Sequence, residues 1–154
     1  MASRTNIYAY VGGNPISLID PFGLRALTEC EKGIIGPHLP NVNLDKIDVQ
    51  EGIPKIAQMF GASGADAWTF KNTIYLGVPD APDTKEGITL LTHEVTHSDQ
   101  YRSMSLLGMG LSYGAMHLIF GYTNNPFEVD ARAKASAVRA QMDKAGGDPC
   151  GCGK

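Results

Sequence analysis

Positive charge is neither abundant nor clustered in this sequence. Its 154 residues contain 13 Lys and Arg against 16 Asp and Glu, which gives a net charge of −3 at pH 7. The chain has no run of basic residues that would follow a phosphate backbone, and such contacts dominate affinity for nucleic acids. We therefore expect no nucleic-acid partner.

An ordinary secretory signal is also missing. The first residues lead into no long apolar stretch that ends in a small-residue cleavage site. If the protein leaves its cell, we expect another machine to export it. With 43% hydrophobic and 19% charged residues, the composition is that of a globular protein, and the length suits about one domain.

Cysteine is scarce, with only Cys30, Cys150 and Cys152. Cys150 and Cys152 are too close in sequence to bridge each other without strain. Three cysteines do not make a disulfide framework, and a second metal site at Cys150 and Cys152 would lack ligands. We therefore predict reduced thiols and a frayed tail rich in Gly and Cys.

One short stretch concentrates residue types that bind metals, His93-Glu94-Val95-Thr96-His97. Residues four apart project from the same face of an α-helix, so His93 and His97 can share one ion, while Glu94 lies about 100° further round. Zinc held by two imidazoles and one carboxylate keeps a position open for water. Glu94 would take that water's proton as general base.

The residues around this motif predict a helix that is partly buried. Ile88, Leu91 and Val95 follow helical spacing and form an apolar stripe beside the histidines. Asp83 with Glu86 three residues later has the form of a capping box, which predicts the start of the helix. The histidines would then lie half sheltered beside the core.

Charged residues are absent from residues 103–127, and 103–122 is long enough to cross a bilayer. Four glycines, three serines and His117 make this run a marginal membrane segment. A span would also place the following residues about 30 Å from His97. We therefore predict a buried helix that returns the chain to the histidines, and we do not expect a membrane partner.

The next stretch predicts another helix, with Asn125 as N-cap, Pro126 at the first position and an end at Gly146. Its apolar face consists of Ala131, Ala135, Val138 and Met142. Glu128 then falls at the third helical position. It would either close a capping box with Asn125 or supply the third metal ligand.

Upstream of the histidines the patterns are weaker. Residues 33–40 resemble a loop, and residues 44–60 have the spacing of a broken helical region. Residues 68–76 alternate as strands do, with a turn predicted at Lys71-Asn72. This part of the sequence predicts one hairpin ahead of the metal helix.

The N-terminal region resembles a known protein boundary. Tyr8, Tyr10, Val11, Asn14-Pro15 and Asp20-Pro21-x-Gly23-Leu24 are similar to the conserved end of the RHS-repeat core. In such secreted proteins this segment precedes a variable C-terminal toxin, and cleavage often follows it. The resemblance implies an arm over residues 1–24, a cleavage boundary after Leu24 and a toxin domain over residues 25–154.

A second resemblance covers residues 70–135. Three motifs occur in order, Asn72-Thr-Ile-Tyr-Leu, His-Glu-x-x-His-x-x-Gln-Tyr and Tyr-x-x-Asn-Pro-Phe-Glu-x-Asp-Ala, and together they are similar to small zinc-peptidase-like domains. The resemblance implies a gluzincin-type site with Glu128 as third ligand and Asp130 as the fallback. It also implies a strand along the substrate cleft, for which residues 73–76 are the candidate, unless that strand only covers the core.

These observations predict an α+β fold: a helical bundle with a small β-sheet or hairpin, in which the His helix and the Glu128 helix are adjacent, as in a minimal zincin core. The expected function is a zinc metallopeptidase with one Zn²⁺ per chain, acting as the toxin of an RHS-type protein. Four residues are candidates for stabilising the oxyanion: Tyr101, Tyr113, His117 and Tyr122.

The expected partners are a protein substrate in the target cell, an immunity protein in the producer and the RHS shell with its secretion apparatus. The protein would stay in the producer's cytosol until export and then enter a target cell. Two other functions stay open. One is a membrane-active toxin that uses residues 103–122, and the other is a binding module that zinc only stabilises.

Overall fold

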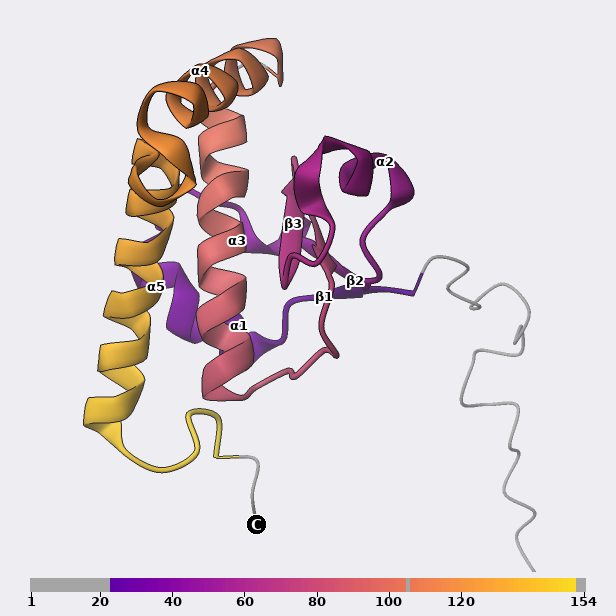
Figure 1. Cartoon of the computed structure of the whole chain (residues 1–154). Coiled ribbons are helices and arrows are strands. Elements are labelled where there is room, and N and C mark those ends of the chain that lie inside the picture. Colours follow the sequence, from indigo (N-terminus) through magenta and orange to yellow (C-terminus); the bar gives the residue numbers. More distant parts are fainter. Residues whose placement is uncertain (1–22, 105, 152–154) are drawn as a thin grey trace, which may run out of the picture.

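The computed structural model describes residues 23–104 and 106–151, in which a central helix separates a small sheet from a second long helix (Figure 1). The central helix is α3 (Lys85–Ser103), and the helix packed along it is α5 (Pro126–Ala145). Helix α4 (Leu106–Asn124) crosses one end of this pair. The predicted α+β class is confirmed, as is the adjacency of the two helices.

The sheet has four strands in the order β1-β2-β4-β3. These are β1 (Leu24–Ala26), β2 (Asp48–Glu51), β3 (Ala67–Phe70) and β4 (Thr73–Leu76). β2 pairs with β4 in parallel, and the other two pairs are antiparallel. The predicted hairpin is confirmed, since β3 and β4 meet at a turn where Lys71 has φ 55°.

The strand chosen as the candidate cleft edge is wrong. Residues 73–76 form β4, which lies between β2 and β3 and has no free edge. The broken helix predicted for residues 44–60 is also wrong, because β2 lies within this stretch and pairs with β4. Only short helical turns occur there: η3 (Leu44–Lys46), α2 (Lys55–Ala57) and the π-helical η4 (Gln58–Ala62). The edge next to α3 belongs to β3.

Residues 33–40 are also more ordered than the expected loop, because α1 (Glu29–Ile35) and the 3₁₀ turn η2 (Gly36–His38) occupy most of them. The start signal of α1 is a capping box in which Thr28 accepts from the Glu31 amide and Glu31 accepts from the Thr28 amide. This local bond pattern outweighs the low helix propensity of Gly33.

Helices α3 and α5 begin as their caps require. Thr84, one residue after the predicted Asp83, caps α3 by accepting from the Gly87 amide. Asn125 caps α5 and Pro126 holds its first position, as predicted. α5 ends at Gly146, whose φ of 73° suits glycine. The predicted apolar residues of both helices are buried: Ile88, Leu91, Val95, Ala131, Ala135, Val138 and Met142.

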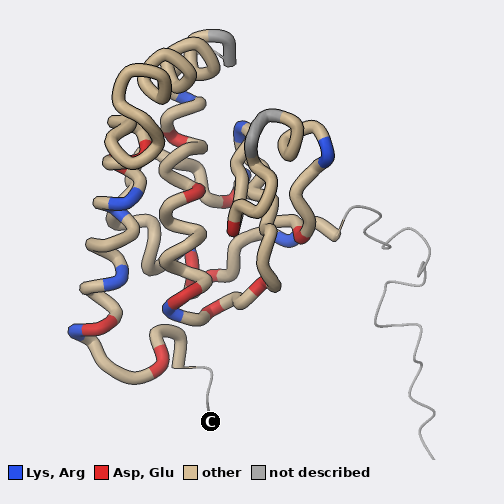
Figure 2. Tube along the Cα trace, viewed as in Figure 1, with Lys and Arg blue, Asp and Glu red and all other residues tan. Residues whose placement is uncertain are grey.

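Helix α4 is not the buried helix that the sequence predicted. Met109 is buried and Met116 is half-buried, but Leu111, Leu118 and Ile119 are 66%, 87% and 68% exposed. Figure 2 shows that no charged residue lies along it. No single described helix meets the length and hydropathy expected of a membrane span, although α3 and Gly108–Asn124 do so as a pair bent by 120°. α4 is apolar on both its inner and outer faces, and only the inner face is covered.

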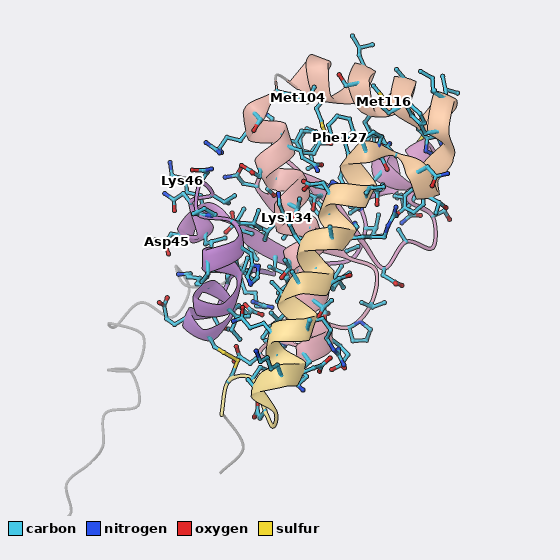
Figure 3. The ribbon with its side chains drawn as sticks, turned by 90° about the vertical axis from the view of Figure 1, so that its left-hand side faces the viewer. Asp45, Lys46, Met104, Met116, Phe127 and Lys134 are labelled. Carbon is cyan, nitrogen blue, oxygen red and sulfur yellow. A yellow bond between two sulfur atoms is a disulfide. The ribbon has the colours of Figure 1, made fainter. Side chains whose placement is uncertain are left out.

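The prediction of reduced cysteines is also wrong. A disulfide joins Cys30 of α1 to Cys150 of the tail, with the two Cα atoms 5.7 Å apart (Figure 3). The bond was missed because residues 120 apart in sequence come together only through the packing of α1, α3 and α5. Closing so long a loop stabilises the folded state by about 4–5 kcal/mol in the chain-entropy model.

Arg25 joins three segments of the domain. Its guanidinium donates from β1 to the Glu31 carboxylate in α1, at 2.9 and 3.0 Å, and to Asp80 in the loop before α3. Glu31 is fully buried. A buried carboxylate is stable only when paired, so this contact fixes β1 and α1 against the loop.

We predict that Arg25→Met lowers the free energy of unfolding by about 3 kcal/mol, because Glu31 would lose its cationic partner inside the protein. Urea unfolding of the oxidised protein measures this change. Arg102→Met is the matched control, since Arg102 pairs with Asp99 on the surface and should matter little. Equal unfolding midpoints for the two variants would contradict the assigned role of Arg25.

Candidate metal centre

The structure brings together the three predicted metal ligands. His93 and His97 lie one turn apart on α3, and Glu128 faces them from the first turn of α5. His93 is half-buried, while His97 and Glu128 are buried. Residues 93 and 128, far apart in sequence, meet because α3 and α5 pack side by side.

The distances among the donor atoms suit one tetrahedral zinc ion. The two Nε2 atoms are 3.2 Å apart. Glu128 Oε1 lies 3.3 Å from His97 Nε2, and Glu128 Oε2 lies 3.4 Å from His93 Nε2. Donors roughly 2.0–2.2 Å from a tetrahedral ion are separated by roughly 3.3–3.5 Å. Glu128 Oε2 is buried and makes no hydrogen bond, with the Arg132 guanidinium 3.8 Å away, so it is free to accept an ion.

The geometry distinguishes the two candidate roles of Glu128, which are a capping box with Asn125 and a metal ligand. The Asn125 side chain accepts from the Phe127 amide, and no capping box with Glu128 forms. Asp130, the fallback ligand, is exposed and bonds Lys134 and Gln100 instead. The carboxylate that faces the histidines is therefore that of Glu128.

The pKa values of Glu128 and His97 are shifted in the directions expected of a site that binds a cation. Burial acts to raise the pKa of Glu128, but the contacts with His93 and His97 and the hydrogen bond from Tyr113 hold it well below its usual range. Burial acts to lower the pKa of His97, but Glu128, Glu94 and Gln100 together hold it above its ordinary value. The negative charges of Glu128 and Glu94 therefore favour a cation, either a proton or a metal ion, at the histidine nitrogens.

Gln100 orients one of the candidate ligands, a role that the sequence patterns did not predict. Its Nε2 donates to the Phe127 carbonyl oxygen at 3.1 Å, so its Oε1 faces the ring of His97. His97 Nδ1 donates to that Oε1 at 2.8 Å, which leaves the Nε2 lone pair of a neutral ring toward the cluster. The sequence does carry a signal, since residue 100 is one helical turn from residue 97.

Glu94, the predicted general base, lies between α3 and the edge strand. Its Oε2 accepts a 2.6 Å hydrogen bond from Thr69 Oγ1 of β3, and both residues are buried. Its negative charge acts on His97 and Tyr113, so it stands close to the cluster without being one of the three grouped ligands. Thr69 was not predicted, because nothing in a strand pattern shows which helix residue it will meet.

The four oxyanion candidates occupy different places. Tyr113 of α4 donates to Glu128 Oε1 at 2.9 Å, and burial, followed by the charge of Glu128, raises its pKa. Burial, followed by the charge of Glu128, also raises the pKa of Tyr122. His117 stacks on Tyr113 but is exposed, and Tyr101 packs against Phe70. Tyr113 and Tyr122 are thus the two candidates that lie against Glu128, a candidate ligand.

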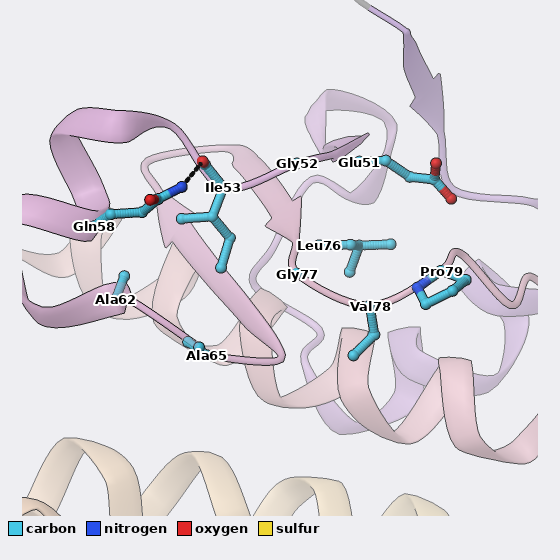
Figure 4. Close-up of a pocket in the computed structure, with 11 residues that line it drawn as sticks. Glu51, Gly52, Ile53, Gln58, Ala62, Ala65, Leu76, Gly77, Val78 and Pro79 are labelled. Carbon is cyan, nitrogen blue, oxygen red and sulfur yellow. Dashed lines mark hydrogen bonds between the residues drawn. The ribbon is translucent and has the colours of Figure 1, made fainter.

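A hollow of about 450 Å³ lies apart from this cluster, at the end of β4 (Figure 4). Its lining includes Ile53, Ala65, Leu76, Val78 and Pro79. None of the three metal-ligand candidates lines it, and neither does Glu94. The candidate metal ligands therefore lie away from this hollow, where α3, α4 and α5 meet.

The described residues thus form an α+β domain with a His-Glu-x-x-His helix and a glutamate on a neighbouring helix as the third candidate ligand. A family model described as the eCIS core domain, for extracellular contractile injection system, matches residues 37–105. The matched segment includes the sheet strands β2 to β4, His93, Glu94 and His97, and it ends before Glu128. It associates this part of the chain with injection systems.

No curated protein and no solved structure matches the chain. The family match does not reach residues 5–24, on which the RHS resemblance rests. Residues 1–22 also lie outside the described part of the structure. The RHS assignment and the cleavage boundary after Leu24 therefore stay predictions.

We predict that the purified protein holds about one zinc per chain and that His93→Ala and His97→Ala lose it, because two remaining ligands bind weakly. Glu128→Gln should also lose most of the zinc, since it removes the only anionic ligand. Asp130→Asn, two residues away, is the control that should keep it. Metal analysis after dialysis measures all four variants, and zinc retained by Glu128→Gln would exclude Glu128 as a ligand.

We further predict that Gln100→Leu lowers zinc affinity roughly 10- to 100-fold, because His97 would lose the acceptor that orients its ring. Competition with a coloured chelator gives the affinity. Gln141→Leu removes a comparable amide on α5 that bonds His38 away from the cluster, and it should bind zinc like wild type. Indistinguishable affinities of the two variants would count against a positioning role for Gln100.

Proposed function

We propose that this domain is a zinc-dependent peptidase that works in the context of a contractile injection system. The observation that carries the proposal is a group of facing donor atoms beside the buried carboxylate of Glu94. The two His Nε2 atoms are 3.2 Å apart, and each lies 3.3–3.4 Å from a different oxygen of Glu128. This arrangement supports hydrolysis because it combines an ion site with a base that is separately held.

The residues divide the chemistry among them. Zinc, when bound, would lower the pKa of a water molecule and polarise the scissile carbonyl. Glu94 accepts the proton of the attacking water and later passes it to the leaving amine. Thr69 holds the Glu94 carboxylate in place from β3. Tyr113 stays protonated because its pKa is raised, and it would donate to the oxyanion only after giving up its hydrogen bond to Glu128 Oε1.

The edge of β3 offers the peptide a place to bind. β3 is the outer strand of the sheet on the α3 side, and its Thr69 touches the proposed base directly. An extended peptide that pairs with this edge would run past Glu94. Main-chain hydrogen bonds would then position the scissile bond without demanding a particular sequence.

The biological setting follows from the family match and from the sequence together. The match supports assembly with an injection apparatus and release or delivery outside the producing cell. Within that setting we propose a protein substrate in the recipient cell and an immunity protein in the producer. Carriage on an RHS-type shell is the finer proposal, supported by the residues quoted between Tyr8 and Leu24.

A membrane-active toxin is the second candidate, and the exposed face of α4 favours it. Leu111, Leu118 and Ile119 face solvent on a helix without a charged residue. Such a surface is costly in water and suits a lipid or another apolar partner. Under this reading the histidine cluster would only stabilise the fold.

We predict that Glu94→Gln keeps zinc and fold but lowers activity by roughly two to four orders of magnitude, because the base is lost while the shape of the side chain is kept. Expression of both forms in bacteria without an immunity partner gives a readout that needs no known substrate. Growth arrest by wild type alone, with new protein N-termini found by proteomics, supports the peptidase.

Wild type and Glu94→Gln also distinguish the peptidase from the membrane-active toxin and the binding module. Equal toxicity of wild type and Glu94→Gln, both carrying zinc, would overturn the peptidase proposal. Dye leakage from liposomes then identifies the membrane-active reading, with Leu118→Glu as the variant that should abolish leakage by charging the outer face of α4. Toxicity without leakage would leave the zinc-stabilised binding module.

A further inference from the structure

A second group of metal-ligand residues lies at the opposite end of α3 from its junction with α4. Cys30 of α1, Asp83 of the loop before α3 and Cys150 of the tail each place one donor atom within 4.8 Å of the others. All three residues are half-buried. In the structure the two sulfur atoms are bonded to each other, and the Asp83 carboxylate lies beside them.

The carboxylate is held toward the cysteines by a defined contact. The Thr28 hydroxyl accepts from the Glu31 amide and donates its own proton to Asp83 Oδ1. Among the described residues, no ion pair neutralises Asp83, and no hydrogen bond occupies its Oδ2. The carboxylate therefore has one oxygen fixed and one available next to two sulfur atoms.

We infer that reduction of the disulfide turns this group into a second metal site, with two thiolates and the Asp83 carboxylate as ligands. A cellular dithiol supplies two electrons and two protons, which convert the Cys30–Cys150 bond to two thiols while the dithiol is oxidised to its own disulfide. Binding of Zn²⁺ then releases the two thiol protons to solvent. Thiolate donors select zinc over magnesium or calcium.

Charge and geometry both suit this change. Two thiolates beside Asp83 would carry three negative charges, and a dication removes most of their mutual repulsion. Sulfur atoms about 2.3 Å from a tetrahedral ion are roughly 3.8 Å apart. Cα atoms 5.7 Å apart allow that separation through side-chain rotation, with water as the remaining ligand. The same two cysteines would hold the tail to α1 in either redox state.

The test uses the whole chain in a Cys152→Ser background, so that Cys30 and Cys150 are the only thiols. One sample stays oxidised, and the other is reduced with a dithiol that is then removed without oxygen. Both are titrated with Co²⁺ and followed by the near-ultraviolet charge-transfer band of cobalt thiolates. We expect no band in the oxidised protein and a strong band, with one additional ion per chain, in the reduced protein.

Variants separate this site from the histidine cluster, which contains no thiol. Glu128→Gln should leave the band unchanged, and Cys30→Ser should abolish it. Asp83→Asn should weaken cobalt binding at the reduced site by at least roughly 10- to 100-fold. That is the loss seen when a group that only supports a ligand is removed, and Asp83 would be a ligand itself. Asn suits this position because it tolerates the φ of 62° found there, and the retained disulfide lets its fold be checked in the oxidised form.

Two results would overturn the inference. One is a reduced protein that shows no thiolate band. The other is an Asp83→Asn variant that binds cobalt as tightly as the parent, because the two thiols would then act without the carboxylate. Neither result bears on the peptidase proposal, which depends on His93, Glu94, His97 and Glu128.

Discussion

The burial of one carboxylate governs how this domain is built. Glu128 is 3% exposed, and removing a carboxylate from water costs several kcal/mol unless a cation or hydrogen-bond donors compensate for it. The compensation comes from α3, which presents His93 and His97, from α4, which presents Tyr113, and from Arg132 one turn further along α5. The packing of α3 on α5 and the position of α4 are therefore linked through a single charged side chain.

Sequence patterns found the elements whose signals are local. The spacing of His93 and His97, the cap and proline at Asn125-Pro126 and the apolar faces of α3 and α5 each involve residues within a few positions of one another. Such signals reflect helix geometry and need no knowledge of tertiary contacts. For Glu128 the local pattern left a capping box and a ligand role open, and only the resemblance favoured the second, since its meeting with the histidines depends on how two helices pack.

The misses share the opposite property. β2 is a four-residue strand whose pairing with β4 overrides its local pattern, and the Cys30–Cys150 bond joins residues 120 positions apart. Thr69 and Glu94 likewise meet only across the contact between sheet and helix. The exposure of α4 was missed for a different reason. An apolar, uncharged stretch indicates that a helix is buried against an apolar surface, but it does not show whether that surface belongs to the same chain or to a partner.

The two ends of α3 place different physical demands on the domain. At its start, Asp83 and Thr84 lie in a region tied together by the disulfide, the Thr28–Asp83 hydrogen bond and the Arg25 contacts, so this end is held firmly. At its other end, α4 covers the histidine cluster with one apolar face and leaves the second face to solvent. His93 is eight residues after Lys85, the first residue of α3, which is about 12 Å along the helix. The fixed start of α3 therefore holds His93 and His97 opposite Glu128, while the outer face of α4 at the other end stays uncovered among the described residues.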